Sequence, residues 1–150
     1  MAGRNHVELM GNLTKNAEVR YTQSGQAVTS FRIACNEKYF AGGEQKERTE
    51  FINVIIWGKR GQAMSKAGLL NKGQGLFIEG RLQTRSYPHA EHEGVKMYVT
   101  EVVTNVGDGA IQLLGRGSGS QAQPPEDVPP PSDDDLPEAA ADDSGDDFAE

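Results

Sequence analysis

Thr49–Trp57, with the sequence TEFINVIIW, is the strongest strand signal in this chain. Side chains alternate along a strand, so one face carries Phe51, Asn53, Ile55 and Trp57 and the other carries Ile52, Val54 and Ile56. Both faces are largely apolar, and each therefore needs a cover. One cover is a hydrophobic core. The other must be a ligand or another subunit, which predicts a symmetric oligomer.

Further strands are predicted on both sides of this stretch, over Val7–Leu13, Val19–Tyr21, Ala27–Asn36, Gly75–Tyr87 and Lys96–Val106. One amphipathic helix is predicted over Arg60–Leu70, with Gly73 as its C-terminal glycine. Tyr39–Arg48 contains Gly42-Gly43 amid charges and is predicted to be an exposed, mobile loop. A helix inserted after the third strand of five is the layout of the OB-fold. We therefore predict an all-β protein, a five-stranded OB-fold barrel with one helix between strands 3 and 4.

Charge divides the chain into two unlike parts. Residues 1–116 hold all 15 basic residues and 11 acidic ones, a net charge of +4, whereas residues 117–150 hold 11 acidic residues and a net charge of −11. The second part is rich in Gly, Ser, Pro and Asp and has too little apolar surface to offset the entropy of ordering. We predict one folded domain over residues 1–114 and a disordered linker and acidic tail over 115–150. Such a pair suggests a polyanionic partner for the domain and a basic partner for the tail.

Several classes of function find no support in the sequence. Cys35 is alone, which excludes an internal disulfide and a cysteine zinc cluster, and it is interpreted as a small core residue. The His89-Ala90-Glu91-His92 run has no further clustered ligands, so a metal site is not expected. No catalytic constellation is visible, and no cofactor is expected. No apolar segment resembles a signal peptide or a membrane helix, so we expect a cytoplasmic, nucleoid-associated protein with no membrane partner.

Several short segments, in the same order and at similar spacing, resemble those of bacterial single-stranded DNA-binding proteins. They are Gly11-Asn12-Leu13, Glu18–Tyr21, Thr49-Glu50-Phe51, Trp57-Gly58-Lys59, Lys72-Gly73, Ile78–Arg85 and Thr100–Val103. The resemblance covers residues 5–114, and a Gly/Pro spacer with an acidic tail is also typical of that family. It implies an OB-fold that assembles, usually as a homotetramer, and binds single-stranded DNA without strong sequence preference or catalysis. It also implies that the tail recruits proteins of replication, recombination and repair.

Binding of single strands without sequence readout needs aromatic platforms for the bases and cations along the phosphates. The resemblance places the stacking aromatics at Tyr39, Phe51, Trp57 and Tyr87. Adjoining aromatic and basic residues complete the predicted DNA-binding set, which is Tyr39, Phe40, Phe51, Trp57, Lys59, Lys72, Arg81, Arg85 and Tyr87. Phe51 and Trp57 also fit core packing, and Arg81 and Arg85 also fit solvated charges on a strand face. These alternatives stay open, and for Trp57 they are evenly balanced.

The acidic tail departs from the family pattern, in which Asp residues precede an aliphatic residue, Pro and a final Phe. Here Phe148 is followed by Ala149-Glu150, and a similar run, Asp133–Pro137, is internal. The predicted partner-binding residues are Asp133, Asp134, Asp135, Leu136, Pro137, Asp146, Asp147 and Phe148. Two other functions are alternatives to single-strand binding. A protein-interaction OB module fits the tail but leaves the aromatic and basic strands unexplained, and an RNA-binding cold-shock-like protein lacks its paired aromatic strand motifs.

Overall fold

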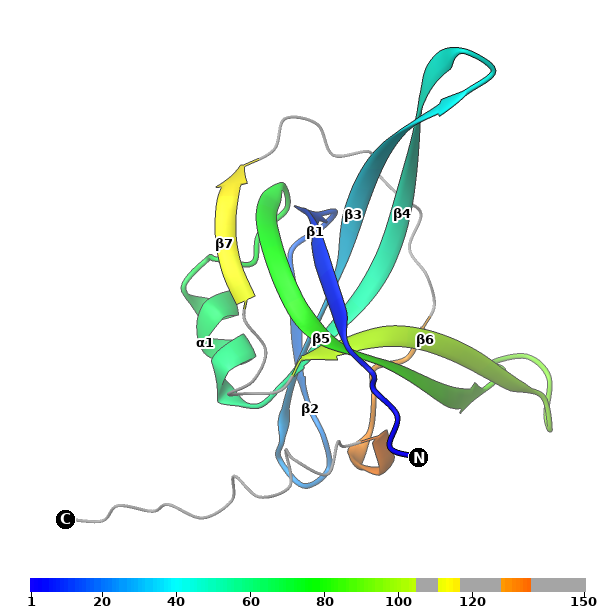
Figure 1. The fold of residues 1–150 in the computed structure, drawn as a ribbon. Helices are drawn as coiled ribbons and strands as arrows, with labels where there is room; N and C mark the ends of the chain where they lie inside the picture. Colours follow the sequence, from blue (N-terminus) through cyan, green and yellow to red (C-terminus); the bar gives the residue numbers. More distant parts are fainter. Residues whose placement is uncertain (105–110, 117–127, 136–150) are drawn as a thin grey trace.

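A computed structural model describes residues 1–104, 111–116 and 128–135. The chain folds into strands β1 (Val7–Leu13), β2 (Glu18–Tyr21), β3 (Ala27–Ala41), β4 (Glu44–Trp57), β5 (Gln74–Pro88), β6 (Lys96–Thr104) and β7 (Ile111–Arg116), helix α1 (Lys59–Lys66) and a short 3-10 helix, η1 (Asp133–Asp135). Figure 1 shows β1, β3, β4, β5 and β6 wrapped into a barrel with α1 beside it.

The barrel closes because β1 pairs with two strands. It pairs with β5 from Val7 to Asn12 and with β3 at Asn12 and Leu13. The remaining neighbours in the barrel follow the order β3-β4-β6-β5, so the sheet closes on itself. All these pairings are antiparallel except β4–β6. The predicted OB-fold, with a helix between the third and fourth barrel strands, is therefore confirmed. The first strand has the predicted bounds, whereas β7, which pairs with β5, was not predicted.

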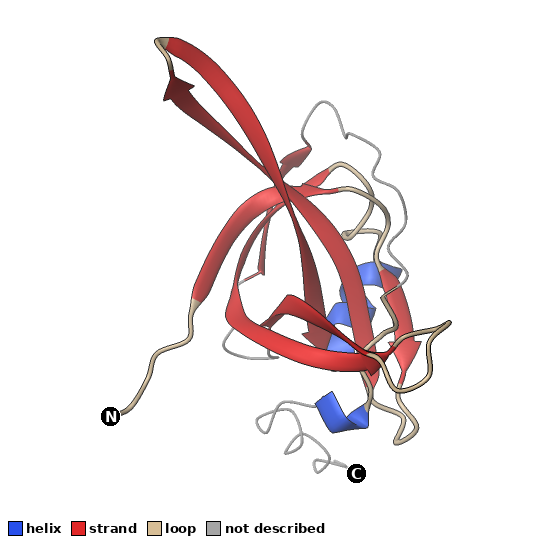
Figure 2. Ribbon diagram, turned by 90° about the vertical axis from the view of Figure 1, so that its right-hand side faces the viewer, coloured by secondary structure: helices blue, strands red, loops and turns tan. Residues whose placement is uncertain are grey.

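The prediction of a loop over Tyr39–Arg48 was wrong. β3 and β4 continue as a two-stranded arm that projects from the barrel, as Figure 2 shows. The two residues at its tip, Gly42 and Gly43, both have positive φ (61° and 78°), as the tight turns of β-hairpins require. Polar side chains join the strands instead of apolar ones, for example Arg48 and Glu37 at 2.6 Å. A charged, glycine-containing segment therefore formed strands because its charges are matched across the pair.

Helix α1 is shorter than predicted because a different glycine ends it. The Gly68 N–H donates to the Ser65 carbonyl, and the Leu69 N–H donates to the Met64 carbonyl, with Gly68 at φ 72°. This is a Schellman motif, which satisfies the last carbonyls of the helix. Leu70 lies beyond the helix but is buried in the core. The prediction that Leu70 belongs to the apolar stripe was thus correct, whereas the prediction that it is helical was wrong.

The core fills the inside of the barrel. It consists of Leu13, Phe31, Ile33, Val54, Ile56, Leu70, Leu76, Ile78, Val102 and Ile111. Cys35 is half-buried and packs against this cluster, in line with its predicted role as a small core residue. No helix in the described part of the chain is long and apolar enough to cross a membrane.

Residues 128–135, within the tail for which we predict disorder, are described and contain η1. Leu136, Pro137, Asp146, Asp147 and Phe148 lie outside the described residues.

Candidate nucleic-acid interface

One outer face of the barrel brings together most of the predicted DNA-binding residues. On β4, Val54 and Ile56 point into the core, so Ile55 and its alternate neighbours point outward. Ile55 pairs with Val103 of β6, and Val103 pairs with Arg81 of β5. Directly paired residues lie on the same side of a sheet. The outer face therefore includes Phe51, Asn53, Ile55, Trp57, Arg81, Gln83, Arg85, Tyr87 and, on β6, Val99, Glu101 and Val103.

The projecting arm extends this face. Ala34 pairs with Phe51, and Phe40 lies six residues further along β3, so it alternates onto the same side of the strand pair. Its side chain is 78% exposed, which a core residue would not be. Tyr39 points to the opposite side of the arm, beyond the barrel, and is also exposed. Both aromatics are accessible to a strand of nucleic acid that crosses the arm.

Three of the predicted stacking aromatics each have an arginine over the ring. The guanidinium carbon lies 5.5 Å from the ring centroid in the Arg32–Phe51 pair, 5.7 Å in the Arg48–Tyr39 pair and 6.0 Å in the Arg85–Tyr87 pair. A ring that stacks on a base beside a cation that faces a phosphate is the arrangement that single strands require. Arg32 and Arg48 were absent from the predicted set. The spacing along one strand cannot reveal them, because they meet their rings through the β3–β4 register.

Trp57 is not available for stacking in this structure. Its side chain is 1% exposed and forms a second cluster with Val28, Ile55 and Val103 on the outer face. Of the two interpretations of Trp57, base stacking and core packing, the structure agrees with core packing. We predicted an oligomer from the sequence because this apolar face needs a cover. Ile55 and Trp57 are already covered within one chain, so this face does not require a second subunit.

Arg85 is also buried, and its charge is matched. Its Nε donates to Glu101 Oε2 at 2.9 Å and its terminal nitrogen to Oε1 at 3.1 Å, a bidentate ion pair. The same terminal nitrogen donates to the Pro129 carbonyl of the tail. Arg81, by contrast, is half-exposed and donates to Gln83 at 3.2 Å. Arg81 is thus the more accessible of the two predicted phosphate contacts on β5.

The two predicted lysines lie away from this face. Lys59 begins α1, and Lys72 follows the turn after it, where its N–H donates to Asn16 Oδ1 at 2.8 Å. Both side chains are exposed. The structure therefore does not bring them together with the aromatic face.

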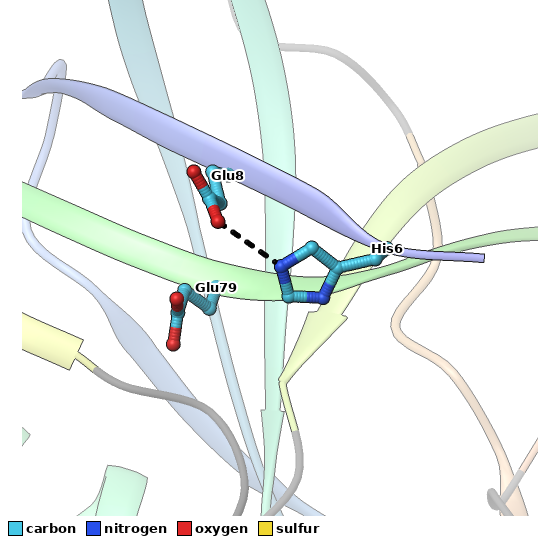
Figure 3. Close-up of side chains that lie close together, drawn as sticks. All are labelled: His6, Glu8 and Glu79. Atoms are coloured by element: carbon cyan, nitrogen blue, oxygen red, sulfur yellow. Dashed lines mark hydrogen bonds and ion pairs between the residues drawn. The ribbon is translucent and has the colours of Figure 1, made fainter. Parts of the chain in front are cut away.

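A group of possible metal ligands lies on the outer side of β1 and β5, as Figure 3 shows. His6 Nε2 is 3.2 Å from Glu8 Oε1, and Glu79, directly opposite Glu8, completes a group of ligand atoms within 4.8 Å of one another. His6 and Glu8 are exposed. Within the described residues no other group of three such ligands occurs, and the rings of His89 and His92 lie 4.8 Å apart without a third ligand.

The closed barrel and its outer face of aromatic and basic side chains define a nucleic-acid-binding protein of the OB-fold class. The chain belongs to the single-strand binding protein family, whose family model matches residues 4–114. That range includes the barrel, the arm and most of β7.

Two solved structures illustrate the similarity. A Plasmodium falciparum SSB in complex with single-stranded DNA matches with a TM-score of 0.66 at 20% identity, over 77% of this chain and 98% of that chain. A deletion mutant of the single-stranded DNA-binding protein from Thermus aquaticus matches with a TM-score of 0.61 at 30% identity, over 75% of this chain and 51% of that chain. The chain thus matches about half of the Thermus protein.

Proposed function

We propose that this protein binds single-stranded DNA without catalysis and largely without sequence preference, and protects it during replication, recombination and repair. The observation that carries the proposal is the series of arginine–aromatic pairs along the arm and the outer face. Membership of the single-strand binding family supports the same conclusion. The similar structure of the Plasmodium falciparum SSB is a complex with single-stranded DNA, which supports the choice of ligand.

The proposed path of the DNA crosses the arm and then follows the exposed members of the outer face. It starts at Tyr39 and Phe40 on the arm, passes Phe51 with Arg32 and continues to Arg81 and Tyr87 on β5. Each stacked base contributes about 1–3 kcal/mol, and neither stacking on flat rings nor contacts between arginines and phosphates distinguish one base from another. Binding with little sequence preference is the expected result.

We further propose that the protein is a homotetramer. Its subunits associate through a different surface from the one that the sequence suggested. From Val7 to Gly11, one edge of β1 pairs with β5, and the described residues provide no strand for the other edge. An open edge of this kind can pair with the same strand of a second copy around a twofold axis. Met10 on the outer side of β1 is 63% exposed, which supports further association of dimers through this sheet.

We also propose that the acidic tail recruits partner proteins. Its net charge of −11 suits recruitment of replication, recombination and repair proteins with basic surfaces, and it would act in the cytoplasm at the nucleoid. A protein-interaction module that binds DNA only incidentally is the competing function, and it predicts no preference for single strands.

The test is a titration of labelled oligo(dT), oligo(rU) and duplex DNA at two salt concentrations. We expect oligo(dT) to bind more tightly than duplex DNA, with an affinity that falls as salt rises because Lys and Arg displace counterions from phosphates. Equal affinity for single and double strands would contradict the proposed function and favour the interaction module.

A further inference from the structure

Three side chains with metal-binding atoms meet where the N-terminal end of β1 pairs with β5, as Figure 3 shows. Glu8 pairs directly with Glu79, so the two carboxylates lie on the same side of the sheet. His6 precedes Glu8 by two residues and therefore alternates onto that side as well. Its Nε2 is 3.2 Å from Glu8 Oε1, and one ligand atom of each residue lies within 4.8 Å of the others. The strand register thus assembles a group of ligands that is not contiguous in the sequence.

The position of His6 is fixed even though this residue precedes β1. The side chain of Asn5 exchanges two hydrogen bonds with the backbone of Leu82 on β5. Its Nδ2 donates to the Leu82 carbonyl at 2.8 Å, and its Oδ1 accepts from the Leu82 N–H at 2.9 Å. On the other side of His6, Val7 pairs with Gly80. His6 therefore lies between two residues that are anchored to β5, which holds its imidazole in place as a metal site requires.

The charges in this group are not balanced. Like charges directly opposite each other on paired strands destabilise a sheet. Glu8 has His6 as its partner, but Glu79 is half-buried and has no hydrogen bond or ion pair in the part of the chain that the structure describes. Arg81, two residues further along β5, donates to Gln83 instead. With a neutral imidazole the group carries the charge of two carboxylates, which one divalent cation would balance.

The ligand types indicate a transition metal ion instead of Ca²⁺ or Mg²⁺. Imidazole nitrogen is a good ligand for Zn²⁺, Cu²⁺ and Ni²⁺, whereas Ca²⁺ and Mg²⁺ prefer oxygen ligands. In a tetrahedral site with metal–ligand bonds of about 2.0–2.1 Å, two ligand atoms lie about 3.3 Å apart, close to the 3.2 Å between His6 Nε2 and Glu8 Oε1. Glu79 would complete the set by rotation of its side chain. His6 and Glu8 are exposed, so a fourth position is open to water.

We propose that His6, Glu8 and Glu79 bind a divalent transition metal ion such as Zn²⁺, with the histidine Nε2 and one oxygen of each carboxylate as ligands. The bound ion would join the start of β1 to β5 and remove the repulsion between the two carboxylates. Zinc should therefore also stabilise the protein, because a ligand that binds the folded state shifts the unfolding equilibrium by mass action. The site is independent of the proposed binding of DNA.

Equilibrium dialysis of the metal-free, full-length protein without an affinity tag against micromolar Zn²⁺ tests the site. The variants His6→Ala and Glu79→Gln remove ligands, whereas the controls His92→Ala and Glu93→Gln remove the same groups from the turn between β5 and β6. We expect a single tightly bound Zn²⁺ per chain in the wild type and in both controls. Loss of a ligand should weaken binding at least about tenfold, since loss of an outer-sphere partner alone costs that much. Equal affinity in His6→Ala and the wild type, or a loss in His92→Ala alone, would overturn the site.

Thermal melts with and without Zn²⁺ distinguish a metal site from a simple ion pair. Zinc should raise the midpoint of the wild type and of Glu93→Gln, and it should leave the midpoint of Glu79→Gln unchanged. If His6 and Glu8 form only an ion pair, Zn²⁺ would change the midpoint of none of these proteins. That result would contradict the metal site.

Discussion

Arg85 and Glu101 form a buried, bidentate ion pair on the outer face of the barrel, with donor–acceptor distances of 2.9 and 3.1 Å. Each charge is compensated by the other, so removal of one leaves the other buried without its partner. We expect Glu101→Ala to lower the free energy of unfolding by about 3–5 kcal/mol. Arg85→Ala should lower it by a comparable amount.

Urea unfolding at a fixed protein concentration measures both changes. The double variant Arg85→Met/Glu101→Leu is the control, because it removes both charges and should be closer to wild type than either single variant. An Arg85→Ala protein of unchanged stability but reduced oligo(dT) affinity would contradict the structural role and restore Arg85 as a phosphate contact.

Phe51 and Trp57 occupy the same strand face but should respond differently to truncation. Phe51 is half-exposed beneath Arg32, so we expect Phe51→Ala to weaken oligo(dT) binding by about 1–3 kcal/mol and to leave the protein folded. Trp57 is buried among Val28, Ile55 and Val103, so Trp57→Ala should lower the free energy of unfolding by about 3–5 kcal/mol. Circular dichroism melts and binding titrations of the two variants check this. Unfolding caused by Phe51→Ala, with unchanged affinity per folded molecule, would show that Phe51 is a core residue.

The Cys35 thiol should react slowly with alkylating agents at neutral pH. Burial raises the pKa of Cys35, and the charges of Glu37 and Glu50 raise it further, so the reactive thiolate is scarcer at neutral pH than in an ordinary cysteine. Glu50 lies directly opposite Cys35 on β4, and Glu50→Gln should lower the pKa and speed alkylation at pH 8. Glu44→Gln, near the tip of the arm, is the control. A pH–rate profile that is the same in wild type and Glu50→Gln would contradict this electrostatic effect.

Met10 should contribute to association if the outer side of β1 is a subunit interface. Met10→Asp places a charge on that side, and we expect the proposed tetramer to dissociate to smaller species at micromolar concentration. Leu69→Asp changes an exposed apolar residue after α1 and is the control. Sedimentation equilibrium measures the outcome. A Met10→Asp protein with wild-type mass would place the interface elsewhere.

The sequence was sufficient to predict the barrel because side chains alternate clearly between the two faces of the predicted strands and the strands contain continuous apolar runs. It was insufficient where tertiary pairing determines structure. The arm was interpreted as a loop because its charges, such as Glu37 and Arg48, become favourable only when the strands pair. We predicted Gly73 as the helix end instead of Gly68 because the apolar pattern of the helix continues to Leu70, and the hydrogen bonds that identify Gly68 are not visible in the sequence.

The site was predicted least well where two strands or the tail meet. Alternation places Trp57 on the outer face but cannot show that Val28 and Val103 cover it. Arg32 meets Phe51 only through the β3–β4 register. The composition of the tail indicates disorder as a whole, yet Asp133 finds Ser24 more than a hundred residues away in the chain, a contact that no local pattern reveals.

The most direct test of a DNA-binding outer face compares two tyrosines on adjacent strands. Tyr87 lies on the outer face with Arg85 beside its ring, whereas Tyr98 pairs with Ser86 and therefore points to the opposite side of the same hairpin, where it is 70% exposed. The measurement is the affinity for oligo(dT) of Tyr87→Ala and Tyr98→Ala at one salt concentration. We predict that Tyr87→Ala loses about 1–3 kcal/mol of binding free energy and that Tyr98→Ala binds as the wild type does. Equal losses in both variants, or a loss in Tyr98→Ala alone, would contradict the account.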